Sequence, residues 1–220
     1  MATAEQAFNK SIERVEALVR LHSQLHGQPG RPQQHVSDIL RSSLVLTMAA
    51  LDAVVSSSVA SVLPELIRCN GIAEAMQKWV KANPDAVVQS LMEEDPVRAL
   101  AQMLEERLLL TSSYQRVEKI QQVLCDYADC HVDWGDVARR ANEAKVGRKK
   151  NWTEGEVRRR LNAFVERRNA IAHQGDLKAT GASTAPIQRD YVVEAIGLTK
   201  CTGAHVCAII KARRKQLKIV

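Results

Sequence analysis

The sequence is poor in aromatic side chains, since only eight of its 220 residues are Phe, Trp or Tyr. Domains that bind single strands on aromatic platforms, such as RRM sheets and OB barrels, need such residues on neighbouring strands. The sequence also has no alternating strand pattern, no internal repeat and no low-complexity tract. These absences argue against single-strand-binding β-folds and predict an all-α chain.

Cysteine is present in an odd number, five, and no two cysteines form a C-x-x-C pair. Residues 1–10 lack the apolar core of a signal peptide, so we predict reduced thiols and a cytoplasmic location. Two groups of cysteine and histidine lie close in the sequence: Cys125, Cys130 and His131, and Cys201, His205 and Cys207. Neither offers four ligands at zinc-finger spacing, so we expect core thiols and no metal or other cofactor.

Long charge-free runs are also scarce. Ser42 to Leu63 carries a single charge, Asp52, in 22 residues, but it contains six serines and a threonine. Such a composition favours a buried helix over a membrane span. No Walker loop, Rossmann glycine fingerprint, G-x-S-x-G elbow or H-E-x-x-H motif occurs, so those enzyme classes have no support here.

Apolar residues at helical spacing predict a bundle of helices in a single domain of residues 1–220, with an N-terminal helix and linker over 1–34. We expect the second helix to stop at Pro64, and Thr153 with Glu156 to form a capping box that opens the eighth. The predicted helices cover residues 2–25, 36–63, 71–81, 85–93, 95–110, 111–129, 134–144, 153–173 and 189–214.

Positive charge is concentrated in one stretch of the chain. The formal net charge is +6, and the stretch from Arg139 to Arg168 alone holds 11 Lys or Arg against 4 Asp or Glu. A basic region of this kind suits a polyanionic partner. A solvated helix face on a soluble protein explains the charge equally well.

The helix predicted over 153–173 has an arginine in its apolar face. Val157, Leu161, Phe164 and Ile171 share one face, and position 168 of the same face is arginine. A charge there costs several kcal/mol unless it is paired or reaches a wet cleft. Arg168 therefore needs a partner, an interface or a ligand.

Asp52 is one candidate partner, because it is the only ionisable residue between Arg41 and Glu65. The two residues could form a structural salt bridge in the core. Alternatively, Asp52 or another polar group could hold Arg168 so that its guanidinium faces a phosphate.

His173 follows Arg168 by five residues, about 140° round an ideal helix. The two side chains can meet only if the arginine bends across, if the last turn before Gly175 distorts, or if the pair acts across a two-fold axis. Asn169 stands four residues before His173 and could fix its tautomer. A histidine at a helix end is also a common C-terminal cation with no further role.

The residues Arg168-Asn169-Ala170-Ile171-Ala172-His173 read R-N-x-x-x-H, and this segment resembles the signature of HEPN domains. The stretch from Arg41 to Asp52 is similar to the first core helix of the RiboL-PSP variant of that family. The resemblance covers most of the chain after about residue 35, except for residues 70–130, which we interpret as a helical insertion.

The resemblance implies a HEPN-like helical bundle that forms a homodimer and joins two motifs in one cleft. It implies a metal-independent endoribonuclease of a prokaryotic defence or toxin–antitoxin system, which cleaves RNA by 2′-hydroxyl transesterification. An antitoxin or another defence-system protein is then a further expected partner. Catalysis is expected at Arg168, Asn169 and His173, with Asp52 and Asp176 in support. The RNA backbone is expected at four basic residues: Lys149, Lys150, Arg160 and Arg167.

The alternative is a module of the same family that binds RNA or a nucleotide, or assembles with a partner, without cutting. The intact Arg168, Asn169 and His173 set favours catalysis. The sequence itself does not identify the RNA target, the cleavage preference or the trigger.

Overall fold

The computed structural model describes residues 3–25, 34–111, 113–149, 151–176 and 184–217, and these residues form an all-α fold. The all-α prediction is therefore confirmed. The elements are α1 (Ala4–Leu25), α2 (Gln34–Ala60), α3 (Leu63–Asn70), α4 (Glu74–Ala82), α5 (Pro84–Leu91), α6 (Pro96–Thr111), α7 (Val117–Ala128), α8 (Trp134–Glu143), α9 (Glu154–Gln174) and α10 (Arg189–Leu217).

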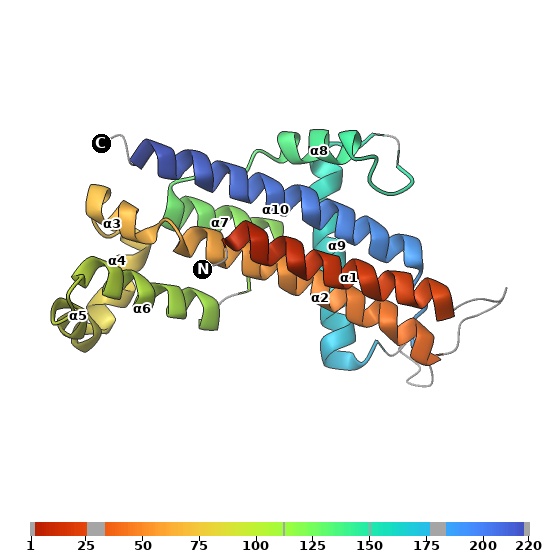
Figure 1. Cartoon of the computed structure of the whole chain (residues 1–220), viewed down its shortest axis with the longest axis horizontal. Helices are drawn as coiled ribbons and strands as arrows, with labels where there is room; N and C mark the ends of the chain where they lie inside the picture. The colour runs from red at the N-terminus through yellow and green to blue at the C-terminus, as the bar shows by residue number, and fades with distance from the viewer. Residues whose placement is uncertain (1–2, 26–33, 112, 150, 177–183, 218–220) are drawn as a thin grey trace.

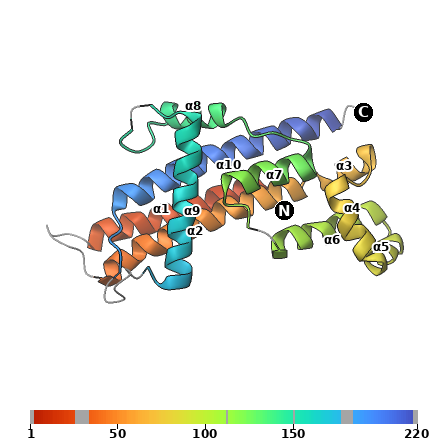
Figure 2. The ribbon, with the colours of Figure 1, turned by 180° about the vertical axis from the view of Figure 1, so that it is seen from behind.

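Three long helices, α1, α2 and α10, lie side by side along the long axis of the molecule (Figure 1). Helix α9 crosses this layer on its other side, with α8 near its first turns (Figure 2). Helices α3 to α6 gather at one end. One hydrophobic core runs through all these parts, from Phe8 on α1 to Leu217 on α10. The crossing leaves the end of α9 beside the start of α2.

Helix α2 is the central helix, as its composition predicts. Leu44, Met48 and Leu51 are fully buried on it. Its buried hydroxyls donate to carbonyls one turn earlier, for example Ser43 Oγ to the Ile39 oxygen at 2.7 Å and Thr47 Oγ1 to the Ser43 oxygen at 2.7 Å. Because these hydroxyls are hydrogen-bonded, the serine-rich helix can enter the core.

The predicted stop at Pro64 is wrong. Helix α2 ends at Ala60, and Pro64 lies in the first turn of α3, a helix that the sequence pattern did not separate from α2. Proline has no backbone N–H, and the first turn of a helix needs none, so Pro64 is compatible with starting α3.

Two helical stretches are long and apolar enough to span a membrane by length and composition alone, His35–Asn70 and Arg189–Leu217. In both, most of the apolar window is buried within the protein, 61% and 56% respectively. Buried core helices of soluble proteins meet the same criterion, so this finding is only weak evidence for a membrane span.

Helices α1 and α10 approach each other closely at Gly203. A Cβ atom placed on Gly203 would lie 2.5 Å from the Phe8 ring. Both residues are buried, so glycine is what allows the Phe8 ring to sit against the α10 backbone.

Candidate functional site

Helix α9 carries the predicted site, and it begins as the sequence indicates. Thr153 and Glu156 form the capping box. A hydrogen bond from the Lys149 ammonium, together with those from Thr153, lowers the pKa of Glu156 to about 2. The carboxylate therefore stays ionised near neutral pH and stabilises the first turn of the helix.

Arg168 lies in the apolar face of α9, as predicted. Val157, Leu161 and Phe164 on this face are fully buried, whereas Arg168 is half-buried. Arg168 Nη1 donates to Asn169 Oδ1 at 3.0 Å. Its Nε is buried and has no hydrogen-bond partner among the described residues, and no carboxylate there forms an ion pair with it. The guanidinium thus keeps donor capacity that the fold does not use.

Asp52 does not pair with Arg168. Its carboxylate accepts a hydrogen bond from the Tyr114 backbone N–H at 2.7 Å and one from Gln115 Nε2 at 3.4 Å. Asp52 therefore fixes the segment that leads into α7. Of the two alternatives for Arg168, a core salt bridge with Asp52 is absent from the described residues, and the side chain that accepts a hydrogen bond from Arg168 there is Asn169.

His173 is exposed in the last turn of α9. The helix stays regular to Gln174, so a distorted last turn does not bring His173 to Arg168. Asn169 accepts from Arg168 but forms no hydrogen bond with His173 in the described part of the chain. Because Asn169 and His173 are four residues apart, they share a helix face. Asn169 thus lies between the two groups, bonded to the Arg168 guanidinium and on the same helix face as His173.

The end of α9 is anchored by Asp176, whose side chain is buried. Asp176 Oδ2 accepts from Arg41 Nε and from Arg167 Nη2, both at 2.8 Å. Arg41 Nη2 also donates to the Ala185 oxygen at 2.7 Å. Gly175 and Asp176 both have left-handed backbone angles, with φ of 60°. This cluster fixes the turn that follows His173 and ties it to α2.

The basic residues expected to bind RNA are engaged within the chain. Lys149 pairs with Glu156, Arg160 with Glu194, and Arg167 with Asp176. Arg160 also lies over the Phe164 and Tyr191 rings, 5.1 and 4.8 Å from their centroids. Lys150 lies outside the described residues. The structure thus brings Arg168, Asn169 and His173 to one end of α9, whereas Lys149 and Arg160 lie toward its start.

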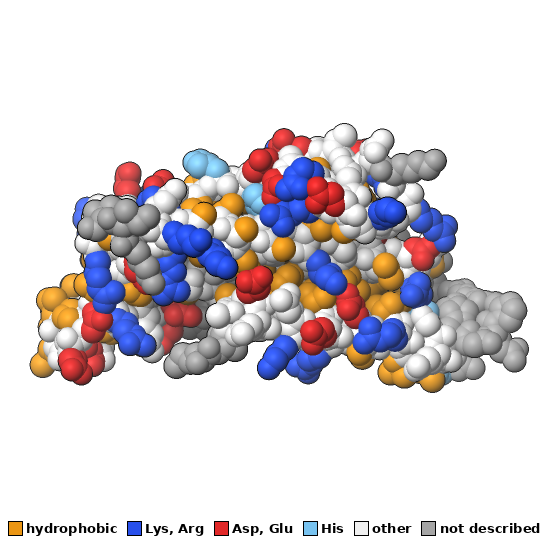
Figure 3. Space-filling model, turned by 45° about the horizontal axis from the view of Figure 1, so that its top comes forward, with side chains coloured by type: hydrophobic (Ala, Val, Ile, Leu, Met, Phe, Trp, Pro, Cys, Tyr) orange, Lys and Arg blue, Asp and Glu red, His pale blue; other side chains and the backbone are white. Residues whose placement is uncertain are grey.

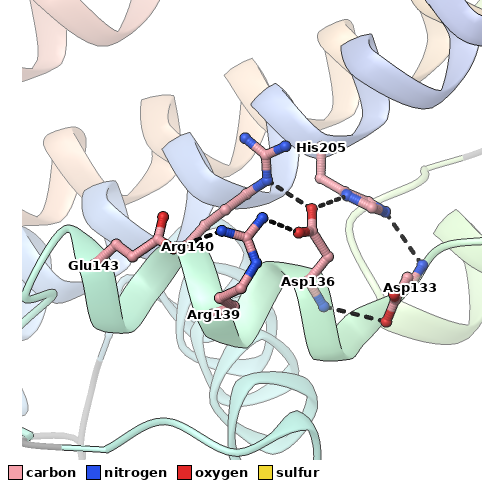
Figure 4. Close-up of polar contacts among 6 residues, drawn as sticks. All are labelled: Asp133, Asp136, Arg139, Arg140, Glu143 and His205. Carbon is pink, nitrogen blue, oxygen red and sulfur yellow. Dashed lines mark hydrogen bonds and ion pairs between the residues drawn. The ribbon is translucent and has the colours of Figure 1, made fainter.

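A histidine–carboxylate pair, His205 with Asp136, joins α10 to α8 (Figure 4). Asp136 Oδ2 accepts from Arg140 Nε at 2.7 Å and pairs with His205 Nδ1 at 2.8 Å. Hydrogen bonds from Arg140, Arg139 and His205 lower the pKa of Asp136 well below its usual range. His205 Nε2 in turn faces the Asp133 backbone N–H at 3.2 Å, so the buried ring has no free nitrogen for catalysis. This pair is a structural clamp.

Metal-ligating side chains do not converge in the described ranges, where no group of three His, Cys, Asp or Glu could hold an ion. The sequence reasoning overlooked the contacts of Arg41 and Arg167 with Asp176. The Gly175-Asp176 pair after the helix was the available signal, because Gly and Asp both tolerate left-handed backbone at a helix end.

Comparison with known proteins leaves the family undetermined by similarity: no protein-family model, no curated protein and no solved structure matches this chain.

Proposed function

We propose that the chain is a metal-independent endoribonuclease whose site is built by Arg168, Asn169 and His173 from two copies. The observation that supports this most is the state of Arg168. Its half-buried side chain forms no ion pair among the described residues and donates there to the neutral amide of Asn169, whereas the Arg41 guanidinium donates to two carboxylates and a carbonyl. A phosphodiester supplies the acceptor oxygens that Arg168 lacks.

The proposed chemistry uses the nucleophile that RNA itself carries. His173 of one copy accepts the proton of the 2′-hydroxyl, whose oxygen then attacks the adjacent phosphorus. The bond from phosphorus to the 5′-oxygen breaks, and His173 of the other copy donates a proton to that oxygen. Arg168 donates to the non-bridging oxygens, where negative charge accumulates. The products are a 2′,3′-cyclic phosphate and a 5′-hydroxyl.

Two copies are needed because one helix does not join the two groups. Arg168 and His173 lie about 140° apart on a regular helix, and the hydrogen bond of Arg168 is to Asn169 and not to His173. A two-fold axis beside the end of α9 would place the His173 of one copy near the Arg168 of the other. The Asp176 anchor would keep both helix ends in position.

The test is incubation of the purified full chain with total RNA in the presence of EDTA. We expect the parent to release fragments with 2′,3′-cyclic phosphate ends. His173→Ala and Arg168→Met should each lose about 100-fold or more of the rate. His131→Ala, which changes an exposed histidine in the segment between α7 and α8, away from the end of α9, should cleave like the parent. Circular dichroism of all four proteins checks the fold.

A non-catalytic binding module is the second candidate. Its protein-assembly form is favoured over an RNA-binding form by the carboxylate partners of Lys149, Arg160 and Arg167, which reduce the charge available to a phosphate backbone. Equal RNA binding without cleavage by the parent and by His173→Ala would support the module. A strict monomer at micromolar concentration in light scattering would contradict the two-copy nuclease.

An antitoxin partner remains part of the proposal. If the purified chain is inactive because a partner masks it, a second protein should co-purify from the native host. Separation of the two under mild denaturation should then release RNA cleavage that requires His173.

A further inference from the structure

A thiol and an imidazole meet beside the end of α7, away from α9. Cys125 Sγ, on α7, lies 3.3 Å from Nδ1 of His131, in the segment that joins α7 to α8. Cys125 is half-buried and His131 is exposed. The thiol is therefore within proton-transfer distance of a base and close to solvent.

Gln121 completes this arrangement, and its orientation is fixed by the backbone. Gln121 Oε1 accepts from the Val132 N–H at 3.2 Å, so the amide nitrogen must face the other way. That nitrogen donates to Cys125 Sγ at 2.9 Å and lies 3.3 Å from His131 Nδ1. A donor aimed at sulfur stabilises the thiolate more than the thiol.

The other cysteines lack this environment. Burial raises the pKa of the Cys130, Cys201 and Cys207 thiols, which keeps them protonated and unreactive. Cys69 is exposed, and its thiol donates to the Leu217 carbonyl oxygen at 3.7 Å. Cys69 therefore serves as an internal reference, an accessible thiol without a base beside it.

We propose that Cys125, His131 and Gln121 form a thiol-modification site at which Cys125 exchanges with small disulfides to form a mixed disulfide. The arrangement is that of an activated nucleophile: a sulfur, a base within hydrogen-bonding distance, and a third group that orients them. It is independent of the RNA chemistry proposed for α9.

The exchange step is balanced as follows. His131 Nδ1 accepts the thiol proton, and the Cys125 thiolate attacks one sulfur of the small disulfide. A new sulfur–sulfur bond forms to Cys125, and the bond within the small disulfide breaks. The departing thiolate takes the proton from His131. The Cys125 sulfur is oxidised, and the released half of the reagent is reduced to a thiol.

The test uses dithiodipyridine on the native full chain at pH 7, with the released thiopyridone followed by absorbance. We expect one cysteine to react at least about tenfold faster than the next. Tandem mass spectrometry assigns it. Trypsin leaves Cys125 and Cys130 on one fragment, residues 120–139, so fragment ions that separate the two are required.

Three variants make the result decisive. Cys125→Ser should abolish the fast phase. His131→Ala and His131→Gln should each slow the labelling of Cys125 about tenfold and leave Cys69 unchanged, because Gln cannot accept the proton at neutral pH. His131 is exposed, and using two replacements guards against a folding defect in either one. If Cys125 reacts no faster than Cys69, or if both His131 variants keep the fast phase, the proposal is overturned.

Discussion

Arg41 and Arg168 show how differently this fold treats two arginines. The Arg41 side chain is 7% exposed, and its guanidinium donates to Asp38, Asp176 and the Ala185 oxygen. Arg168 donates to the neighbouring Asn169 and has a buried Nε without a described partner. Arg41 is a structural residue whose donors are satisfied. Arg168 lowers the stability of the folded chain through its unpaired buried donor, and a ligand or an interface would offset that loss.

At the residue scale, we therefore predict opposite effects of the same substitution. Arg168→Met should leave stability unchanged or raise it by about 1 kcal/mol, because it removes an unpaired buried donor. Arg41→Met should lower stability by about 3 kcal/mol, because it leaves Asp176 buried with only Arg167. Urea unfolding measures both. A large loss of stability in Arg168→Met would show that Arg168 has a structural partner.

Asp136 gives a prediction about pH. Because its folded pKa lies below the ordinary value, its stabilising effect is fully present above about pH 4 and is lost as pH falls further. Asp136→Asn should cost about 2 kcal/mol at pH 7, since Arg140, Arg139 and His205 lose their shared carboxylate.

The difference in unfolding free energy between the parent and Asp136→Asn should shrink as pH falls from 5 to 2. Asp129→Asn is the matched control. Its carboxylate is 73% exposed and pairs only with Arg213 among the described residues, so it should cost less than about 1 kcal/mol at any pH. If the difference in unfolding free energy between the parent and Asp136→Asn stays constant with pH, the lowered pKa of Asp136 is contradicted.

At the element scale, the Asp176 cluster couples the end of α9 to the start of α2. Asp176→Ala should cost about 3 kcal/mol, because it leaves Arg41 buried without its main carboxylate. Asp38→Ala should cost less than about 1 kcal/mol, because Asp38 pairs with the same arginine but is 53% exposed. Hydrogen exchange should quicken at the end of α9 in the first variant only. Equal protection in both would mean that Asp176 does not anchor the helix.

Gly203 in α10 and Gly155 in α9 allow the effect of the same Gly→Ala change on stability to be compared in a close helix contact and in an open helix turn. Gly203→Ala places a Cβ 2.5 Å from the Phe8 ring and should cost about 1–3 kcal/mol. A Cβ atom placed on Gly155, in the first turn of α9, has no neighbour within 4 Å. Gly155→Ala should therefore raise the free energy of unfolding by about 0.5 kcal/mol. Thermal unfolding ranks the two variants. Truncating Phe8 to Leu should partly restore Gly203→Ala, and no restoration would show that the contact is not limiting.

Most helices were predictable from the sequence, because helical periodicity and caps are local properties. The Thr153 and Glu156 capping box formed as predicted, and so did the apolar face around Arg168. The break between α2 and α3 was not predictable from Pro64, because proline suits both the end of one helix and the first turn of the next.

The partners in the candidate site were harder to predict, because they are distant in sequence. Asp52 carries a negative charge that could pair with Arg168. Its position along α2 brings it instead to the Tyr114 backbone N–H. Asp176 is paired with Arg41, 135 residues away. Composition identifies residues that need a partner, but only the packing of helices decides which partner each one meets.

At the scale of the whole molecule, the positive charge is largely compensated. Lys and Arg side chains alternate with Asp and Glu on the face shown in Figure 3. Within residues 139–168, most of the described basic side chains form ion pairs: Arg139, Arg140, Arg148, Lys149, Arg158, Arg160 and Arg167. In the described part of this stretch, Lys145, Arg159 and Arg168 have no ion pair.

This compensation predicts a weak salt dependence of RNA binding. The three described cations without an ion pair give a slope of log affinity against log salt of about −2 per chain, whereas all eleven basic residues of the stretch, with the undescribed Lys150 included, would give about −8. Fluorescence anisotropy with a labelled single strand at several salt concentrations measures the slope. A slope near −8 would show that the ion pairs open on binding.

The contact between α1 and α10 also constrains how the chain folds as it is made. Phe8 leaves the ribosome long before Gly203, the residue it packs against, has been added. Until then α2 is the main described element that covers the apolar side of α1. The nascent chain must therefore carry an incomplete core until α10 has been made, and chaperones that bind exposed apolar helices should act during this interval.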